Sequence, residues 1–422
     1  PGSTSTAYTV SPAHLDAATL GDRLKALSPA SRNVAVGGKD RSAVMMSGRN
    51  VDQRWFWDGK TFVTDLKGAP VPQTVTAFKT ALASAIATAR PALTPPPLCQ
   101  ARARAYQLTP ALKVGEGPLE GAAGDGRQFR ITPELDGATL ALAGALVQEM
   151  QLGRGAATDI LSISLAATDY VGHAYGTDGM EMCLQMLALD RELGDFLAML
   201  DRSGIDYAVV LSADHGGMDI PERLREKGVA GAARAEAGLP ASEVGKLMAP
   251  QFGRTESVLK GIGIGGDIWL DAGLPAAQRA PVLRAARDRY AAHPQVHAAF
   301  TSAEIKAVPM PTGSPDKWSL IQRVRASFDP ARSGDLYVVL KQNISPIAVP
   351  SSGYAATHGS PWDYDRRVPI IFWRKGAAGA SSDQAVETID IMPTLAAMIG
   401  LPVQRGSVEG RCLPAAGIAC PQ

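Results

Sequence analysis

Three short stretches of the sequence combine aspartate and histidine in patterns that suit metal binding. Asp169 and His173 stand four residues apart, Asp214 and His215 are adjacent, and His358 lies in Ala-Thr-His-Gly-Ser. These stretches hold half of the six histidines in the 422 residues. Carboxylate oxygen and imidazole nitrogen suit zinc best among common ions, while manganese, iron and cobalt stay open. Because one catalytic zinc takes three or four ligands, five candidates indicate two ions.

Each stretch also has an ordinary structural interpretation. An aspartate that follows a strand often caps a helix, and a lone buried histidine usually has a hydrogen bond. The co-occurrence of the two Asp/His pairs favours the metal site. The remaining histidines, His14, His293 and His297, stand beside proline or alanine in polar stretches, and we expect no metal there.

The elements that must position these residues are short apolar runs. Five runs are rich in valine, isoleucine and leucine without clean alternation, as in strands buried on both faces: 32–38, 159–167, 207–212, 335–340 and 368–373. A helical pattern covers 184–200 behind a cap signal at Thr177-Asp178. We therefore expect an α/β fold with a mostly parallel central sheet and helices on both faces.

Both Asp/His pairs come directly after two of these runs, 159–167 and 207–212. Because open α/β sheets bind ligands at the carboxyl ends of their strands, we expect both pairs at one edge of the sheet. Two regions look like additions to it. The stretch 91–133 is a Pro-, Gly- and Ala-rich surface insertion with little strand pattern. The stretch 221–333 is an α+β cap-like insertion, with strands expected at 267–270 and 296–300 and a helix at 276–292.

Composition argues against other classes of protein. The net charge of +1 and the lack of a long like-charge run give no face for nucleic acid. No apolar stretch reaches the roughly 20 residues of a membrane helix, so we expect no membrane partner. We also expect the protein to be a monomer. Cys412 and Cys420 are close enough in a loop-like tail to form a disulfide, although they could also be separate buried thiols. A disulfide favours a periplasmic or secreted location. The pairing of Cys99 and Cys183 stays open.

Together these stretches resemble the metal-binding signature of the alkaline phosphatase superfamily. The matching motifs are Asp169-Tyr-Val-Gly-His173, Ser-Ala-Asp214-His215-Gly-Gly-Met, Thr-His358-Gly and Asp390-Ile-Met-Pro-Thr-Leu. The resemblance covers essentially the whole chain. It is strongest to the type I phosphodiesterase/nucleotide pyrophosphatase-like branch, and within it to periplasmic alkaline phosphatases with a threonine nucleophile. It implies that Asp169, His173 and His358 hold one zinc. Asp214 and His215 would hold the second.

A separate pair of cations bears on the substrate. Lys39 and Arg41 follow a strand and a Gly-Gly turn, where two fixed positive charges suit a phosphate dianion. The ordinary alternative is a solvated turn. The resembling phosphatases carry this Lys-x-Arg pair and related phosphodiesterases typically lack it. The resemblance therefore implies that the pair binds substrate and that the substrates are small phosphate monoesters.

The reaction implied is a two-step displacement through a covalent phosphoenzyme at a two-zinc site. The resembling enzymes carry the threonine nucleophile, an asparagine and one more aspartate ligand well before the Lys-x-Arg pair. We therefore expect the nucleophile and this ligand upstream of Pro1, so that 1–422 is a single catalytic domain without its N-terminal segment. A threonine among the first nine residues is the alternative nucleophile. The alternative functions are a phosphodiesterase or nucleotide pyrophosphatase, and a non-catalytic metal- or phosphate-binding fragment.

Overall fold

The central sheet has four strands in the order β3-β2-β1-β6. They are β1 (Asn33–Gly37), β2 (Gln53–Trp57), β3 (Phe62–Val63) and β6 (Ile160–Ser164). β1 runs parallel to both β2 and β6, with Val34 opposite Gln53 and Leu161, while β3 is antiparallel to β2. This is a computed structural model, and it describes residues 8–117, 119–404, 406–414, 418 and 420. The predicted α/β fold with a parallel central sheet is confirmed.

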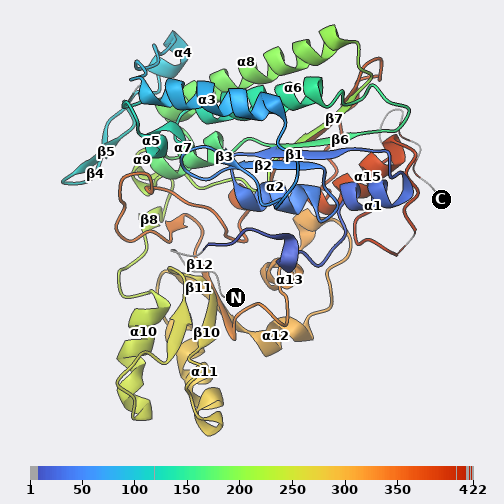
Figure 1. Cartoon of the computed structure of the whole chain (residues 1–422). Helices are drawn as coiled ribbons and strands as arrows, with labels where there is room; N and C mark the ends of the chain where they lie inside the picture. Colours follow the sequence, from blue (N-terminus) through green and yellow to red (C-terminus); the bar gives the residue numbers. More distant parts are fainter. Residues whose placement is uncertain (1–7, 118, 405, 415–417, 419, 421–422) are drawn as a thin grey trace.

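Helices cover both faces of this sheet (Figure 1). On one face lie α3 (Gln73–Ala87), α6 (Glu134–Glu149) and α8 (Met180–Ser203), and on the other α1 (Leu20–Leu27), α2 (Asp40–Ser47) and α15 (Ile391–Met398). Buried side chains of β1 and β2, Val34 and Trp55 among them, pack against α3 and α6. The helix expected over 184–200 is α8, but its N-cap is Gly179. The predicted Thr177-Asp178 cap is wrong, because the carboxylate of Asp178 instead pairs with Arg102 and Lys227.

Two further strands form a separate pair. β7 (Ala208–Ser212) runs antiparallel to β14 (Ile370–Arg374). We expected buried strands here, yet β6, β7 and β14 are all partly exposed, and Leu211, Ile371 and Trp373 have 39%, 50% and 41% of their surface open. Within the described ranges β6 pairs only with β1, and β7 only with β14. Because one edge of each of these strands has no neighbouring strand in the described part of the chain, their apolar side chains are only partly buried.

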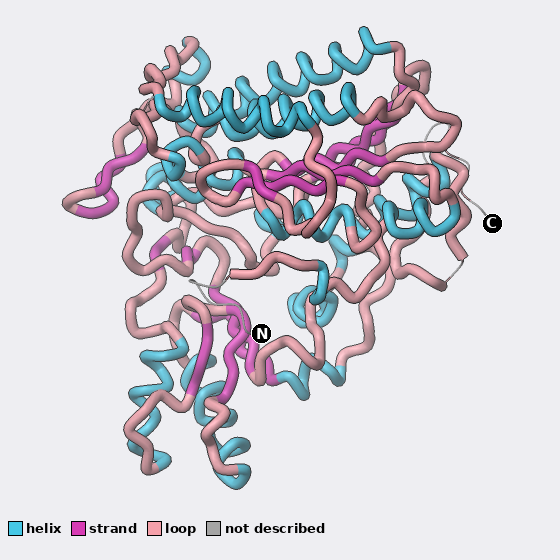
Figure 2. The backbone as a smooth tube through the Cα atoms, viewed as in Figure 1, coloured by secondary structure: helices cyan, strands magenta, loops and turns pink. Residues whose placement is uncertain are grey.

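The cap-like region folds around a second, antiparallel sheet in the order β11-β12-β10-β9. Its elements are β9 (Leu259–Gly261), β10 (Gly266–Leu270), β11 (Val296–Thr301), β12 (Leu336–Leu340), α10 (Ala241–Met248) and α11 (Ala276–Ala291). Figure 2 shows this unit projecting from the helix-covered main sheet. The strand, helix and strand expected within 267–300 are confirmed as β10, α11 and β11. The run at 335–340 is also a strand, but it pairs with β10 and β11 rather than with the main sheet.

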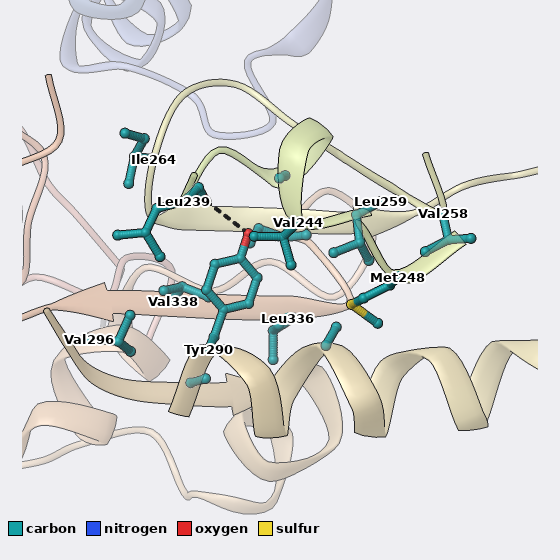
Figure 3. Packing of buried hydrophobic residues seen from close by; sticks show 14 of the residues in the cluster. Leu239, Val244, Met248, Val258, Leu259, Ile264, Tyr290, Val296, Leu336 and Val338 are labelled. Carbon is teal, nitrogen blue, oxygen red and sulfur yellow. Dashed lines mark hydrogen bonds between the residues drawn. The ribbon is translucent and has the colours of Figure 1, made fainter. Parts of the chain in front are cut away.

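This second unit has its own apolar core, which Figure 3 shows at close range. Tyr290 of α11 is 1% exposed, and its hydroxyl donates a hydrogen bond of 3.1 Å to the carbonyl of Leu239. Met248, Leu259 and Leu336 pack in the same cluster. The burial of this tyrosine costs little stability because its one polar side-chain atom, the hydroxyl oxygen, has a hydrogen-bond partner. The cap-like region can therefore hold its shape through its own contacts.

The insertion at 91–133 contains more structure than expected. It holds a hairpin of β4 (Tyr106–Thr109) and β5 (Leu112–Val114), with α4 (Pro97–Gln100) and α5 (Gly126–Phe129). A disulfide between Cys99 and Cys183 ties α4 to α8, and the predicted Cys412–Cys420 disulfide is confirmed. The remaining helices and strands are α7 (Ala167–Tyr175), α9 (Pro221–Glu226), α12 (Ser302–Ala307), α13 (Leu320–Ala326), α14 (Asp363–Arg366), β8 (Ala233–Arg234) and β13 (Ile344–Ser345). None of the helices described is both long and apolar enough to cross a bilayer.

One partly buried carboxylate predicts how the stability of the fold depends on pH. Burial raises the pKa of Glu192 on α8 from 4.5 to about 7, helped by the charges of Asp136, Asp195 and Glu134 and opposed by Arg191. The folded chain therefore holds this proton more tightly than the unfolded chain, and the stability it contributes is lost as pH rises from about 4.5 through 7. In the Glu192→Gln variant the glutamine side chain cannot ionise, so the variant lacks this pH dependence. We expect its melting temperature to exceed the parent's by about 2 °C at pH 8 and to match it at pH 4. An equal gain at both pH values would contradict this origin.

Candidate metal centre

The predicted ligands come from three segments that backbone hydrogen bonds hold together. Asp169 lies in the first turn of α7, directly after β6, and His173 lies in its last turn, so both side chains share one helix face. Asp214 and His215 follow β7. The loop that carries His358 is fixed to α7, because the amides of Ala355 and Ala356 both donate to the carbonyl of His173 at 2.6 and 3.0 Å. The three segments therefore converge beyond the ends of β6 and β7.

The histidine side chains meet at one carboxylate oxygen. The Nε2 atoms of His173, His215 and His358 lie 3.4, 3.7 and 3.2 Å from Oδ1 of Asp169. The ligand atoms of Asp169, His215 and His358 all lie within 4.8 Å of one another. The rings of His215 and His358 stack with centroids 3.4 Å apart. The structure thus gathers four of the five predicted ligands around Asp169, with His215 and His358 in the tightest set and His173 beside it.

The hydrogen bonds of two histidines leave the correct nitrogen available for a metal. Nδ1 of His173 lies 2.8 Å from the carbonyl of Ala356, and Nδ1 of His215 lies 2.8 Å from the carbonyl of Gly216. A carbonyl can only accept, so in each ring Nδ1 carries the proton and Nε2 keeps a free lone pair. Metal-binding histidines typically have this arrangement. The donor set of carboxylate and imidazole Nε2 therefore fits a zinc-like cation.

Asp214 is placed differently from the other four. Its side chain is 79% exposed, and its Oδ2 lies 3.4 Å from Nε2 of His215. It is close enough to share a cation with His215, but it stands at the solvent side of the group. Asp169, in contrast, is only 14% exposed. Asp169 therefore lies at the middle of the group and Asp214 lies at its rim.

Lys39 joins this group through its ammonium, which forms an ion pair with Oδ2 of Asp169. The contact depends on two tightly packed turns. Gly38 donates its amide to the carbonyl of Ser164 at 2.9 Å, and a Cβ on Gly38 would lie 2.6 Å from that of Ala166. Glycine is therefore required for the turn after β1 to reach the turn after β6. Arg41 is different: its side chain is 74% exposed and lies 3.8 Å from Asp40.

These neighbours decide the charge of the group. Burial acts to raise the pKa of Asp169, but hydrogen bonds from His358 and Lys39 and the charges of His173 and Lys39 hold that pKa well below its usual range. Burial lowers the pKa of His173, although Asp169 and the carbonyl of Ala356 oppose the shift. At neutral pH an ionised carboxylate thus faces an imidazole that favours its neutral form. Those are the protonation states in which both side chains bind metal.

Two side chains beside the group were not foreseen from the sequence. The ring of Tyr354 lies 5.4 Å from that of His173. Asp365 is buried, and its Oδ2 accepts from the amide of Ser360 at 2.7 Å, which holds the loop just after His358. Its carbonyl also accepts from the amide of Gly216 at 2.7 Å. Neither residue stands in a metal-ligand motif, so their spacing in the sequence gave no signal.

Comparison with known proteins places this arrangement in a family. The family model for type I phosphodiesterase / nucleotide pyrophosphatase matches residues 34–361. Alkaline phosphatase PhoK of Sphingomonas sp is 48% identical over 415 residues, which are 98% of this chain and 74% of the relative. Alkaline phosphatase PhoD of Zymomonas mobilis is 43% identical over 421 residues, 98% of this chain and 73% of the relative. The crystal structure of alkaline phosphatase PafA matches with a TM-score of 0.80 at 23% identity, covering 95% of this chain and 77% of that one. The chain therefore belongs to the type I phosphodiesterase / nucleotide pyrophosphatase family.

Proposed function

We propose that this protein is a metal-dependent hydrolase of phosphate monoesters. The observation that carries the proposal is identity of 48% and 43% to two proteins named alkaline phosphatases, each over 98% of the chain. The site supports it, because a lysine lies inside a group of metal-ligand side chains. The predicted phosphodiesterase or nucleotide pyrophosphatase activity is the alternative within the same family.

We further propose that the group binds two zinc ions. Asp169, His173 and His358 would hold one ion, and Asp214 with His215 the other. The distances of 3.4 and 3.2 Å from Nε2 of His173 and His358 to Oδ1 of Asp169 support the first set, and the 3.4 Å separation of Asp214 from His215 supports the second. His215 also lies 3.7 Å from the same oxygen of Asp169, so the two sets adjoin. Bound metal would supply Lewis acidity for the phosphoryl oxygens and for an attacking oxygen.

The residues of this chain would bind the phosphate by charge. Lys39 pairs with the carboxylate of Asp169, and its ammonium has further donors for a phosphoryl oxygen. We propose Arg41 as a second cation, one whose exposed side chain has to turn toward the substrate. Attack through a covalent phosphoenzyme stays a prediction, and the nucleophile is not assigned. The two disulfides support an exported location, periplasmic or secreted.

The direct test compares substrates on the zinc-loaded full-length protein. We expect hydrolysis of a simple aryl phosphate with kcat/KM at least about tenfold above that for the matching aryl diester, because only the monoester carries the second charge that a Lys-Arg pair can bind. Dialysis against a chelator is expected to abolish the activity, and added zinc to restore it. Faster diester turnover would favour the phosphodiesterase alternative. Bound zinc without turnover of either ester would favour the non-catalytic alternative for these 422 residues.

A further inference from the structure

A carboxylate from a neighbouring helix caps the helix that carries two metal ligands. Asp136 on α6 is completely buried. Its Oδ1 accepts a hydrogen bond of 2.9 Å from the amide of Ala167, the first residue of α7. The N-cap position of α7 itself is Ala166, which has no side-chain oxygen to accept from the first turn. Asp136 therefore supplies from α6 the cap that the sequence of α7 lacks.

A buried amide fixes this carboxylate from the other side. Gln185 on α8 is also completely buried, and its Nε2 donates to Oδ2 of Asp136 at 3.0 Å. The same nitrogen lies 3.3 Å from the hydroxyl of Thr168, the residue next to Asp169. One network thus joins α6, α7 and α8 directly beneath the first ligand. Burial raises the pKa of Asp136 to about 7, against the hydrogen bonds from Ala167 and Gln185, so this side chain acts at α7 as a hydrogen-bond acceptor rather than as a full negative charge.

We propose that Asp136 is a positioning residue that fixes the amino end of α7, and with it the direction of Asp169 and His173, so that the chain binds zinc tightly. The side-chain hydrogen bonds of Asp136 described above go to Ala167 and Gln185, and neither goes to Asp169 or His173. It acts through the backbone of Ala167, two residues before Asp169. A shift or fraying of this first turn would move the carboxylate on which three histidines converge. Mutation of a residue that holds a metal ligand in place typically lowers metal affinity by about 10- to 100-fold.

The chain offers a matched control on the same helix. Glu149 of α6 caps another helix, α3, by accepting from the amides of Gln73 and Thr74 at 2.9 and 2.8 Å. α3 carries none of the proposed ligands. Asp136→Ala and Glu149→Ala therefore each remove one cap that α6 provides to a neighbouring helix, but only the first cap lies under the metal centre. Because Asp136 is buried and Glu149 is exposed, the zinc affinity of each variant is compared at its measured melting temperature, which separates loss of positioning from general loss of stability.

The measurement is zinc affinity of the full chain, by competition with a chromophoric chelator, alongside the melting temperature. We expect Asp136→Ala to weaken zinc binding about tenfold and Glu149→Ala to leave it unchanged. Asp136→Asn keeps an acceptor at Oδ1, and rotation of the Gln185 amide presents its Oε1, which has no hydrogen-bond partner, to the new NH2 group. We therefore expect this variant to stay within about threefold of the parent. Should Asp136→Ala not fold, Gln185→Leu tests the same network, with an expected loss of about threefold.

The inference rests on the proposed metal centre, and the two can fail separately. A parent chain that does not bind zinc would remove the metal centre itself. A parent that binds zinc, with equal affinity in Asp136→Ala and Gln185→Leu, would overturn only the positioning role. The role would also be overturned if Glu149→Ala weakened zinc binding as much as Asp136→Ala at a similar drop in melting temperature.

Discussion

Replacing Asp169 by asparagine is expected to lower kcat/KM for a phosphate monoester by at least about 10³-fold and to remove most bound zinc. Asparagine has nearly the same shape but cannot supply a negative charge. It would leave the ammonium of Lys39, which pairs with Oδ2, without its anionic partner, beside three imidazoles that converge on Oδ1. Metal content by elemental analysis, measured with the kinetics, shows whether the lost activity follows the lost metal.

The matched control for this substitution is Asp178→Asn. Asp178 lies just after α7 and forms ion pairs with Arg102 and Lys227 on the surface. Asp178→Asn removes one negative charge, as Asp169→Asn does, but outside the ligand group. The surface ion pairs that it breaks contribute little to the stability of the fold. We expect its zinc content and activity to equal the parent's. Full zinc content and activity above a tenth of the parent's in Asp169→Asn would show that the central ligand has been misassigned.

Replacing Lys39 by alanine is expected to act on one class of substrate. We expect kcat/KM for a monoester to fall about 100-fold and that for a diester to fall much less, because a diester lacks the second charge that this cation binds. Zinc content should not fall, since removing Lys39 leaves Asp169 free of a competing cation. Parallel kinetics on an aryl monoester and diester, with metal analysis of the same samples, check both statements.

Two further variants sharpen this test. Arg41→Ala is expected to have the same preference for the monoester with a smaller loss, because its side chain is 74% exposed and lies beside Asp40. Lys60→Ala removes an exposed positive charge on the loop between β2 and β3, and we expect no effect on either substrate. Equal losses of monoester and diester activity in Lys39→Ala would contradict a role in recognising the dianion.

The sequence was sufficient to predict that the candidate metal ligands lie close together, and insufficient to describe the contacts that hold them in place. Asp169 and Asp214 could be assigned to one edge because each follows a run of strand-forming residues. The exposure of Asp214 depends on how the loop after β7 packs, which no local pattern records. Asp136 stands 33 residues before Asp169 and acts through a backbone amide, so neither its type nor its spacing marks it.

The sequence likewise predicted some strands correctly and failed on others. β2 went unpredicted because two polar residues, Gln53 and Arg54, precede its three aromatic residues, yet Arg54 is buried with its guanidinium paired to Asp65. A charge can be buried in a central strand only with such a partner, and the partner lies on another segment. β12 was predicted as a strand but assigned to the wrong sheet. Its apolar run indicates burial, whereas the antiparallel partners β10 and β11 are set by the packing of the cap-like region.

The disulfide between Cys99 and Cys183 makes the stability of the fold that carries the candidate metal centre depend on oxidation. Its separation of 84 residues encloses α6, β6 and α7, and so Asp169 and His173, while His215 and His358 lie outside it. Closing a loop of that length removes about 4.5 kcal/mol of unfolded-chain entropy, against about 2.5 kcal/mol for the eight-residue ring at Cys412. A reducing environment would thus lower the stability of the folded chain mainly through the loss of Cys99–Cys183, and less through the loss of Cys412–Cys420.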